Sequence, residues 1–427
     1  MCDDPNSFET WQAEAGSLAD AFDALSQRAL QLEVHGAFRI RSKCLREARA
    51  LAALLDAAER MQDDRARAGL LAERVAGARN NLAGLEAEIR AVELCPDPAW
   101  VGGTVRLDGP DAPDGEGARA IEVDAAVRGG SVWVEIKGTQ KFDVTSSSWT
   151  GASRHVKGLR SQAQLLFAAA AMPRNWVRYR APEVAFVFAD GAHESVRREL
   201  ERMGAAVIDG MPASRSAMDA ALPGAPPRPA TTVLDVTTLC ALVSEVSNGG
   251  VVDRLAEVRA WAAGNVHRTA CVDAELEAPL LPSLASAVQR DLLGPASAPG
   301  ADVVAPRSVV ERFEGLVEAF AGPSERARWA RLRARVGEVD PRSLPECARC
   351  VGGSAGGAGW EGAVVAGARA ATGSGEAGDV GTWGALEVAL AVRGLAVTAN
   401  GKGVAAVRAA GAPIEAHVHR TVWLTGL

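Results

Sequence analysis

Residues 231–239 read Thr-Thr-Val-Leu-Asp-Val-Thr-Thr-Leu. This apolar, β-branched run follows a proline-rich segment and is too short for a typical helix, so it predicts a buried first strand. Asp235 lies inside it, and a buried carboxylate requires a cation or hydrogen-bond donors. Two interpretations stay open: Asp235 belongs to an acidic site, or Asp235 or Thr237 caps a helix over residues 239–246.

Helices and strands alternate on both sides of this stretch, which predicts an α/β fold with a mainly parallel sheet and ligands at the carboxyl ends of its strands. We expect a C-terminal α/β/α domain over residues 231–427. The predicted strands are 231–238, 302–305, 362–366, 395–398 and 414–417. The predicted helices are 239–248, 252–261, 306–320, 324–336, 382–392 and 403–410.

The first half of the chain shows a different order of patterns. Residues 8–95 read as a helical region, with apolar positions spaced for helix packing; a coiled coil that binds a protein partner is the alternative. Residues 95–113 read as a loop. Residues 100–210 form a second α/β domain with a hairpin of strands 120–127 and 131–137. Further elements are a helix at 155–171, a strand at 184–188, a helix at 196–203 and a strand at 205–208. Residues 211–230 are a proline-rich linker.

The composition predicts a protein of two or three domains. The chain has 427 residues, 48% of them hydrophobic and 23% charged, with a net charge of −7. No apolar run reaches the ~20 residues of a membrane span. The N-terminus lacks signal-peptide character and the seven cysteines are mostly scattered, so we expect an intracellular protein, cytoplasmic or nuclear.

Polar residues stand at the ends or starts of the C-terminal elements. Asp235 lies on the first strand, Glu311 one helical turn after the second, and Asp379 before the helix at 382–392. Asn400 follows the strand at 395–398. In a parallel sheet these side chains would converge at one edge, where several carboxylates predict a Mg²⁺ or Mn²⁺ site.

This layout resembles the PIN-domain nucleases: a strand-borne Asp, a helical Glu, an Asp that opens a later helix, and Thr398-Ala399-Asn400 in place of a terminal Thr-x-Asp. Further motifs resemble an uncharacterised eukaryotic family with a C-terminal PIN-like domain of unknown function. They are residues 234–239 with 246–249, Gly373-Ser374-Gly375-Glu376, residues 407–410 and residues 422–426. The resemblance implies that Asp235, Glu311, Asp379 and Glu376 are candidate metal ligands, with Glu376 competing with Asp379 for one place.

A second set of polar residues lies on the predicted hairpin. Asp124 is on its first strand, and Glu135 and Lys137, two residues apart, face one side of its second strand. This Asp, then Glu-x-Lys arrangement resembles the PD-(D/E)XK nucleases, in which carboxylates bind Mg²⁺ and the lysine positions water or stabilises phosphate charge. Gln162 would add a contact. The alternative is a cross-strand salt bridge on an exposed hairpin.

Together the resemblances imply a divalent-metal-dependent nuclease-like protein that acts on nucleic acid, RNA more than DNA. Asp235, Glu311, Asp379 and Asn400 would form one centre, and Asp124, Glu135 and Lys137 the other. The competing hypothesis is a nuclease fold that has lost its chemistry and binds nucleic acid or protein. The neutral side chain of Asn400, where the PIN family has a carboxylate, favours that hypothesis.

Overall fold

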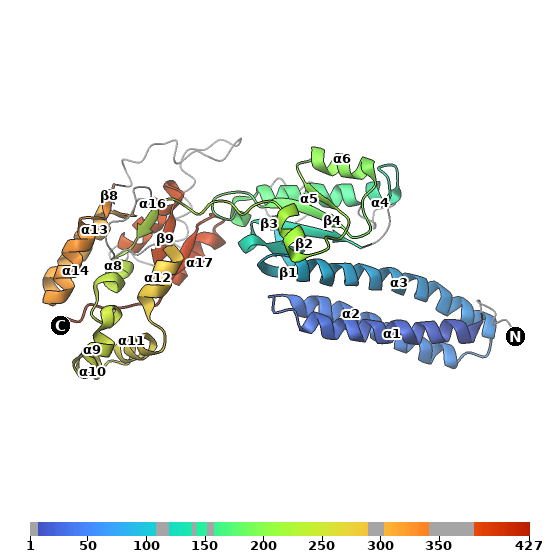
Figure 1. Ribbon diagram of the computed structural model, residues 1–427, viewed down its shortest axis with the longest axis horizontal. Helices are drawn as coiled ribbons and strands as arrows, with labels where there is room; N and C mark the ends of the chain where they lie inside the picture. Colours follow the sequence, from blue (N-terminus) through green and yellow to red (C-terminus); the bar gives the residue numbers. More distant parts are fainter. Residues whose placement is uncertain (1–6, 108–118, 139–141, 152–157, 289–302, 341–379) are drawn as a thin grey trace. The chain divides into compact units, whose positions relative to one another are not determined.

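The computed structural model describes residues 7–107, 119–138, 142–151, 158–288, 303–340 and 380–427. The chain divides into two compact units, Met1–Pro226 and Pro227–Leu427. Each unit is α/β, which confirms the predicted class (Figure 1). Among the described helices, none combines the length and the apolar character needed to cross a bilayer.

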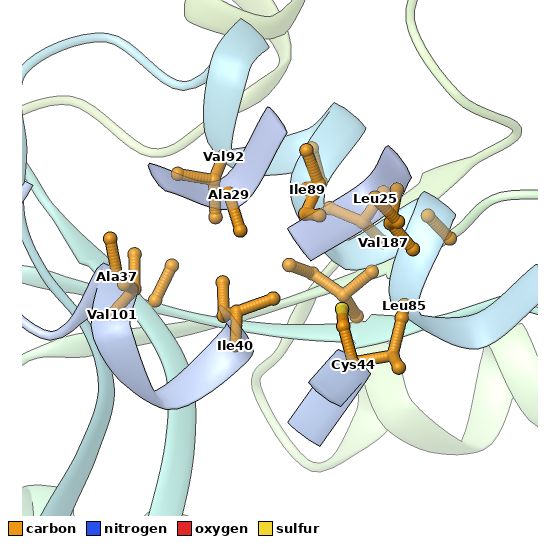
Figure 2. Packing of buried hydrophobic residues seen from close by; sticks show 14 of the residues in the cluster. Leu25, Ala29, Ala37, Ile40, Cys44, Leu85, Ile89, Val92, Val101 and Val187 are labelled. Carbon is orange, nitrogen blue, oxygen red and sulfur yellow. The ribbon is translucent and has the colours of Figure 1, made fainter. Parts of the chain in front are cut away.

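Three long helices open the first unit: α1 (Phe8–Leu30), α2 (Ala37–Glu59) and α3 (Asp64–Leu94). The side chains of Ser7 and Asp63 accept backbone N–H groups at the starts of α1 and α3, which supplies partners for amides that a helix end leaves over. α2 and α3 contact one face of a sheet, and α1 packs on these two helices. In Figure 2, Leu25, Ile40 and Ile89 from the three helices lie together near Val187 of that sheet.

The first sheet has five strands in the order β1-β2-β3-β4-β5. The pairs β1–β2 and β2–β3 are antiparallel, whereas β3–β4 and β4–β5 are parallel. The short 3₁₀ turn η1 (Arg128–Gly130) joins β2 to β3. The strands are β1 (Pro98–Leu107), β2 (Arg119–Val127), β3 (Val132–Lys137), β4 (Glu183–Phe188) and β5 (Ala206–Asp209).

The face of this sheet opposite α1–α3 is covered chiefly by α5, so each face has its own hydrophobic cluster. Phe186 and Trp133 point into the cluster beneath α5, and Val134 and Val187 point into the other. The alternation follows from the two-residue period of a strand. The remaining elements are α4 (Ser147–Thr150), α5 (Leu159–Ala171), η2 (Pro173–Asn175), α6 (Glu194–Arg202) and α7 (Arg215–Ala221).

The second unit has a sheet in the order β10-β9-β6-β7-β8, and every described pair in it is parallel. Its strands are β6 (Thr232–Leu234), β7 (Val303–Pro306), β8 (Gly337–Val339), β9 (Leu395–Thr398) and β10 (Ala416–Val418). Its described helical elements are α8 (Val236–Val243), η3 (Val246–Gly250), α9 (Val251–Asp253), α10 (Leu255–Ala262), α11 (Val266–Glu277), α12 (Leu280–Val288), α13 (Arg307–Phe320), α14 (Pro323–Arg333), α16 (Val380–Ala391) and α17 (Gly401–Ala409).

Several element predictions differ from the structure. The predicted linker at 211–230 contains the helix α7, whose Met218 is buried in the same hydrophobic cluster as α1–α3. The helix α12 and the strand β8 lie where the sequence predicts no element. The predicted loop at 95–113 contains β1 instead, in which Gly102 and Gly103 interrupt the strand pattern. The first strand of the second unit ends at Leu234, because Asp235 caps α8, which begins at Val236. The helix α11 follows Asn265, whose side chain caps it, in a stretch without a predicted element. The predicted strand at 362–366 lies outside the described residues.

Glu325 at the start of α14 binds the last residues of the chain. Its side chain is fully buried. Oε1 accepts the amides of Glu245 and Thr425 at 3.0 and 2.9 Å, and Oε2 accepts those of Gly322 and Gly426 at 3.1 Å. The Thr425 hydroxyl is also within 3.0 Å of Oε1. A buried carboxylate is tolerated here because donors surround both oxygens.

We expect Glu325→Gln to destabilise the second unit by about 3 kcal/mol, because the new NH₂ group would face N–H donors and leave them unsatisfied. Urea denaturation measures this loss, and limited proteolysis should release the C-terminal residues early. Glu318→Gln, on the exposed face of α13, is the matched control and should leave both measurements unchanged. Equal stability of the two variants would contradict the structural role of Glu325.

Candidate functional site

Backbone pairing between β2 and β3 stops at Ala125 and Val134. Beyond that pair the two strands part, and Asp124 and Glu135 are the next residues along them. The carboxylate of Asp124 accepts the amide of Ile136 at 2.8 Å. The carboxylate thus supplies the hydrogen-bond acceptor that this buried N–H lacks once the strands have parted.

Glu135 lies on the face of β3 that α5 covers, with 3% of its surface exposed. Its Oε1 accepts the Lys137 ammonium at 2.6 Å and the Gln162 side-chain amide, and Lys137 also donates to Gln162 Oε1 at 3.1 Å. Glu135 Oε2 is buried and has no hydrogen-bond partner among the described residues. We call Asp124, Glu135, Lys137 and Gln162 the acid–lysine cluster.

The helical layer adds charged residues that the sequence analysis missed. Gly138 follows β3, and a Cβ built on it would lie 2.6 Å from the Cα of Gly84 in α3. This close contact brings α3 to the end of β3, and Glu88 is one helical turn beyond Gly84. Lys43 of α2 lies 3.6 Å from a Glu88 oxygen and 2.9 Å from a Glu122 oxygen. A charged residue within the apolar seam of α3 was the only sequence signal for this position.

Burial, reinforced by the charge of Asp124, raises the pKa of Glu135 to about 8 and that of Glu88 to about 7. Burial opposes the charge of Lys137, but Glu135 and Asp124 outweigh it, so the pKa of Lys137 is raised. The site therefore contains more carboxylates than its two lysines stabilise. Such a site can take up protons or a cation to relieve the repulsion.

The second unit places Asp235 as a helix cap. Asp235 is fully buried, and its Oδ1 accepts the Thr238 amide at the start of α8 at 2.8 Å. The hydroxyl groups of Thr237, Thr238 and Thr398 also donate to its carboxylate, at 2.5–2.8 Å. These donors satisfy both oxygens, as the capping interpretation of this stretch requires.

The other residues predicted for the C-terminal site have separate surroundings. Asn400 does reach the same sheet edge: Thr398 Oγ1 accepts its amide at 2.9 Å, and its side chain caps α17. Glu311 is exposed on α13. Glu376 and Asp379 lie outside the described residues. Within the described part of the chain, no three His, Cys, Asp or Glu side chains are grouped so that they could hold a metal ion.

We expect the free energy of unfolding to depend on pH through Glu88. Its folded pKa, about 7, lies above the ordinary value of 4.5, so the fold loses stability as the pH rises between these values. In EDTA, Glu88→Gln should match the wild type near pH 5 and exceed it by about 2–3 kcal/mol at pH 8.

Urea denaturation at the two pH values measures the difference. Glu86→Gln, exposed on the same helix, is the matched control and should behave as the wild type does at both. A Glu88→Gln advantage of the same size at pH 5 and pH 8 would contradict a raised pKa.

No protein-family model matches the chain, and neither a curated protein nor a solved structure matches it. The resemblances to PIN-domain and PD-(D/E)XK nucleases therefore rest on the residues themselves. Both stay predictions, to be judged by the chemistry that each site can support.

Proposed function

We propose that the chain is a divalent-metal-dependent phosphodiesterase that cleaves nucleic acid, with its reaction centre at the acid–lysine cluster. One observation carries the proposal. Glu135 is almost fully buried beside a second carboxylate, and its Oε2 has no hydrogen-bond partner in the described structure. A buried acceptor without a partner is costly, and a protein retains one most readily where a bound ligand supplies the missing partner.

The cluster fits a hard cation. Mg²⁺ is commonly bound by one or two carboxylates together with waters and substrate phosphate oxygens. Asp124 and Glu135 would supply the carboxylates, and the repulsion that raises the pKa of Glu135 favours a positive ion between them. A bound cation would lower the pKa of a coordinated water and stabilise negative charge on an attacked phosphate.

Lys137 would act on the phosphate or the attacking water. Two of its three N–H groups are engaged by Glu135 and Gln162, which leaves one for a phosphate oxygen or a water. Its contacts hold the ammonium in place before any ligand arrives. Such fixed charge is an effective way to stabilise the charge that develops in a transition state. Gln162, which contacts both Lys137 and Glu135, would position these two side chains.

The second unit supports this chemistry less well. Asp235 has both oxygens occupied by donors, and Glu311 is exposed. The PIN resemblance remains consistent with the parallel sheet and with the convergence of Asp235 and Asn400 at one edge. Because donors already occupy both oxygens of Asp235 and Glu311 is exposed, we assign no chemistry to that edge.

The competing function is nucleic-acid binding without cleavage. One observation favours it: Lys137 and Gln162 together occupy Glu135 Oε1. In a protein that has lost catalysis, this contact would serve as a permanent internal salt bridge. The two functions make different predictions for the same assay.

We expect the full chain with Mn²⁺ to cleave labelled single-stranded RNA, and Glu135→Gln and Lys137→Ala to lower the rate about 10²–10³-fold by removing charge at the phosphate. Gel electrophoresis of the products measures the rate, with single-stranded DNA as a parallel substrate. Glu183→Gln, exposed at the start of β4, is the matched control for the carboxylate change.

Asp235→Asn distinguishes the two units. Cleavage that is lost in Asp235→Asn but kept in Glu135→Gln would move the reaction to the second unit. Binding of RNA or DNA without cleavage by the wild type would replace the proposal with the competing function. Circular dichroism of each variant separates lost chemistry from lost folding.

A further inference from the structure

A pocket of about 500 Å³ lies along β1 in the first unit. Tryptophans line it from three elements: Trp100 of β1, Trp133 of β3 and Trp176 after η2. Arg39 of α2 and Arg174 of η2 also line it, and none of the described lining residues is acidic. Its volume is within the range of small-molecule sites. None of these residues belongs to the acid–lysine cluster.

The aromatic rings are fixed before any ligand binds. A Cβ on Gly103 would overlap the Trp100 ring, so the indole lies directly on the strand backbone at a position that requires glycine. The indole N–H of Trp176 donates to the Ala171 carbonyl at 3.2 Å, and Asn175 donates to the Ala169 carbonyl at 2.8 Å. Both bonds secure the η2 segment to the end of α5.

The segment that follows Trp176 is strained. Arg178 and Tyr179 have φ angles of 51° and 62°, in the left-handed region that side chains other than glycine rarely adopt. Val177 and Arg180 close this tight turn with two backbone hydrogen bonds of 2.9 and 3.1 Å. Strain of this kind persists where the surroundings fix the backbone, and it is concentrated at binding sites.

The pocket and the charged residues near the acid–lysine cluster are neighbours. A Cβ on Gly102 would lie 3.4 Å from Arg39 Cβ and 3.9 Å from Glu122 Oε1. Arg39 and Lys43 are four residues apart on α2, so they lie on one face of the helix. Lys43 is the cation that pairs with Glu122 and Glu88. A ligand that extends from the pocket along α2 would therefore approach Lys43 and Glu122.

We infer that this pocket binds an unpaired nucleotide of a single-stranded nucleic acid. Trp100 and Trp176, which are only partly buried, offer flat surfaces for a base, and the arginines offer charge for its phosphates, the combination by which proteins bind single strands. The inference deepens the proposed function, on which it rests only for the identity of the substrate. A duplex would be a poor ligand, because its bases are already stacked within the helix.

The test is the affinity of the full chain for a fluorescein-labelled 12-nucleotide single-stranded RNA, measured by anisotropy in EDTA so that cleavage does not interfere. We expect Trp176→Ala to raise the Kd about 5- to 100-fold and Trp176→Phe to restore most of the affinity. Arg174→Ala should weaken binding and reduce the slope of log Kd against log salt by about one.

Phe320→Ala and Arg198→Ala are the matched controls. Phe320 is 62% exposed in the second unit, and Arg198 pairs with Glu194 on α6; both variants should bind as the wild type does. A duplex of the same sequence should bind at least about tenfold more weakly, since the stacking contribution of an unpaired base is absent.

Unchanged affinity in both Trp176→Ala and Arg174→Ala overturns the pocket, even if Glu135→Gln abolishes cleavage. Equal affinity for duplex and single strand also overturns it, because the base would then make no contribution. Affinity lost in Trp176→Ala, in a wild type that cleaves nothing, supports the pocket and removes the proposed function. The two hypotheses can thus fail separately.

Discussion

The parting of β2 and β3 after Ala125 and Val134 determines the electrostatics of the first sheet. Where two paired strands separate, backbone donors and the side chains beside them lose their usual neighbours. Asp124 satisfies the Ile136 amide, and the next residue of β3, Glu135, is buried against α5 with Lys137 and Gln162 as its partners. Burial there makes the carboxylate hard to ionise, so the electrostatics of the region follow from a backbone feature.

Much of the first sheet follows from local sequence. The alternation in residues 120–127 and 131–137 with an intervening Gly-Gly turn predicts β2 and β3 to within a residue or two. β1 could not be predicted in the same way, because Pro98 and the Gly102-Gly103 pair resemble a loop. Its strand character arises from pairing with β2 and from the Trp100 ring lying on Gly103. These are tertiary contacts, which local propensity does not contain.

The residues of the candidate site, too, could be predicted from the sequence only in part. The spacing of Glu135 and Lys137 on one strand predicts that they share a face, and the structure brings them together with Gln162. Glu88 and Lys43 come from helices dozens of residues away, so no local pattern relates them to the site. For Asp235 the local sequence was ambiguous, because it allowed either a site carboxylate on a strand or a helix cap. Only the positions of Thr237, Thr238 and Thr398 decide between the two roles.

The contact between Gly84 and Gly138 has a consequence for the modularity of the protein. Two glycines touch here, so α3 is joined to the first sheet without intervening side chains. A shortened chain that begins after residue 95 would remove Lys43 from Glu122 and uncover the apolar sheet face that includes Val134 and Val187. The helices α1–α3 are therefore part of the same compact unit as the sheet, and one face of the sheet depends on them for its burial.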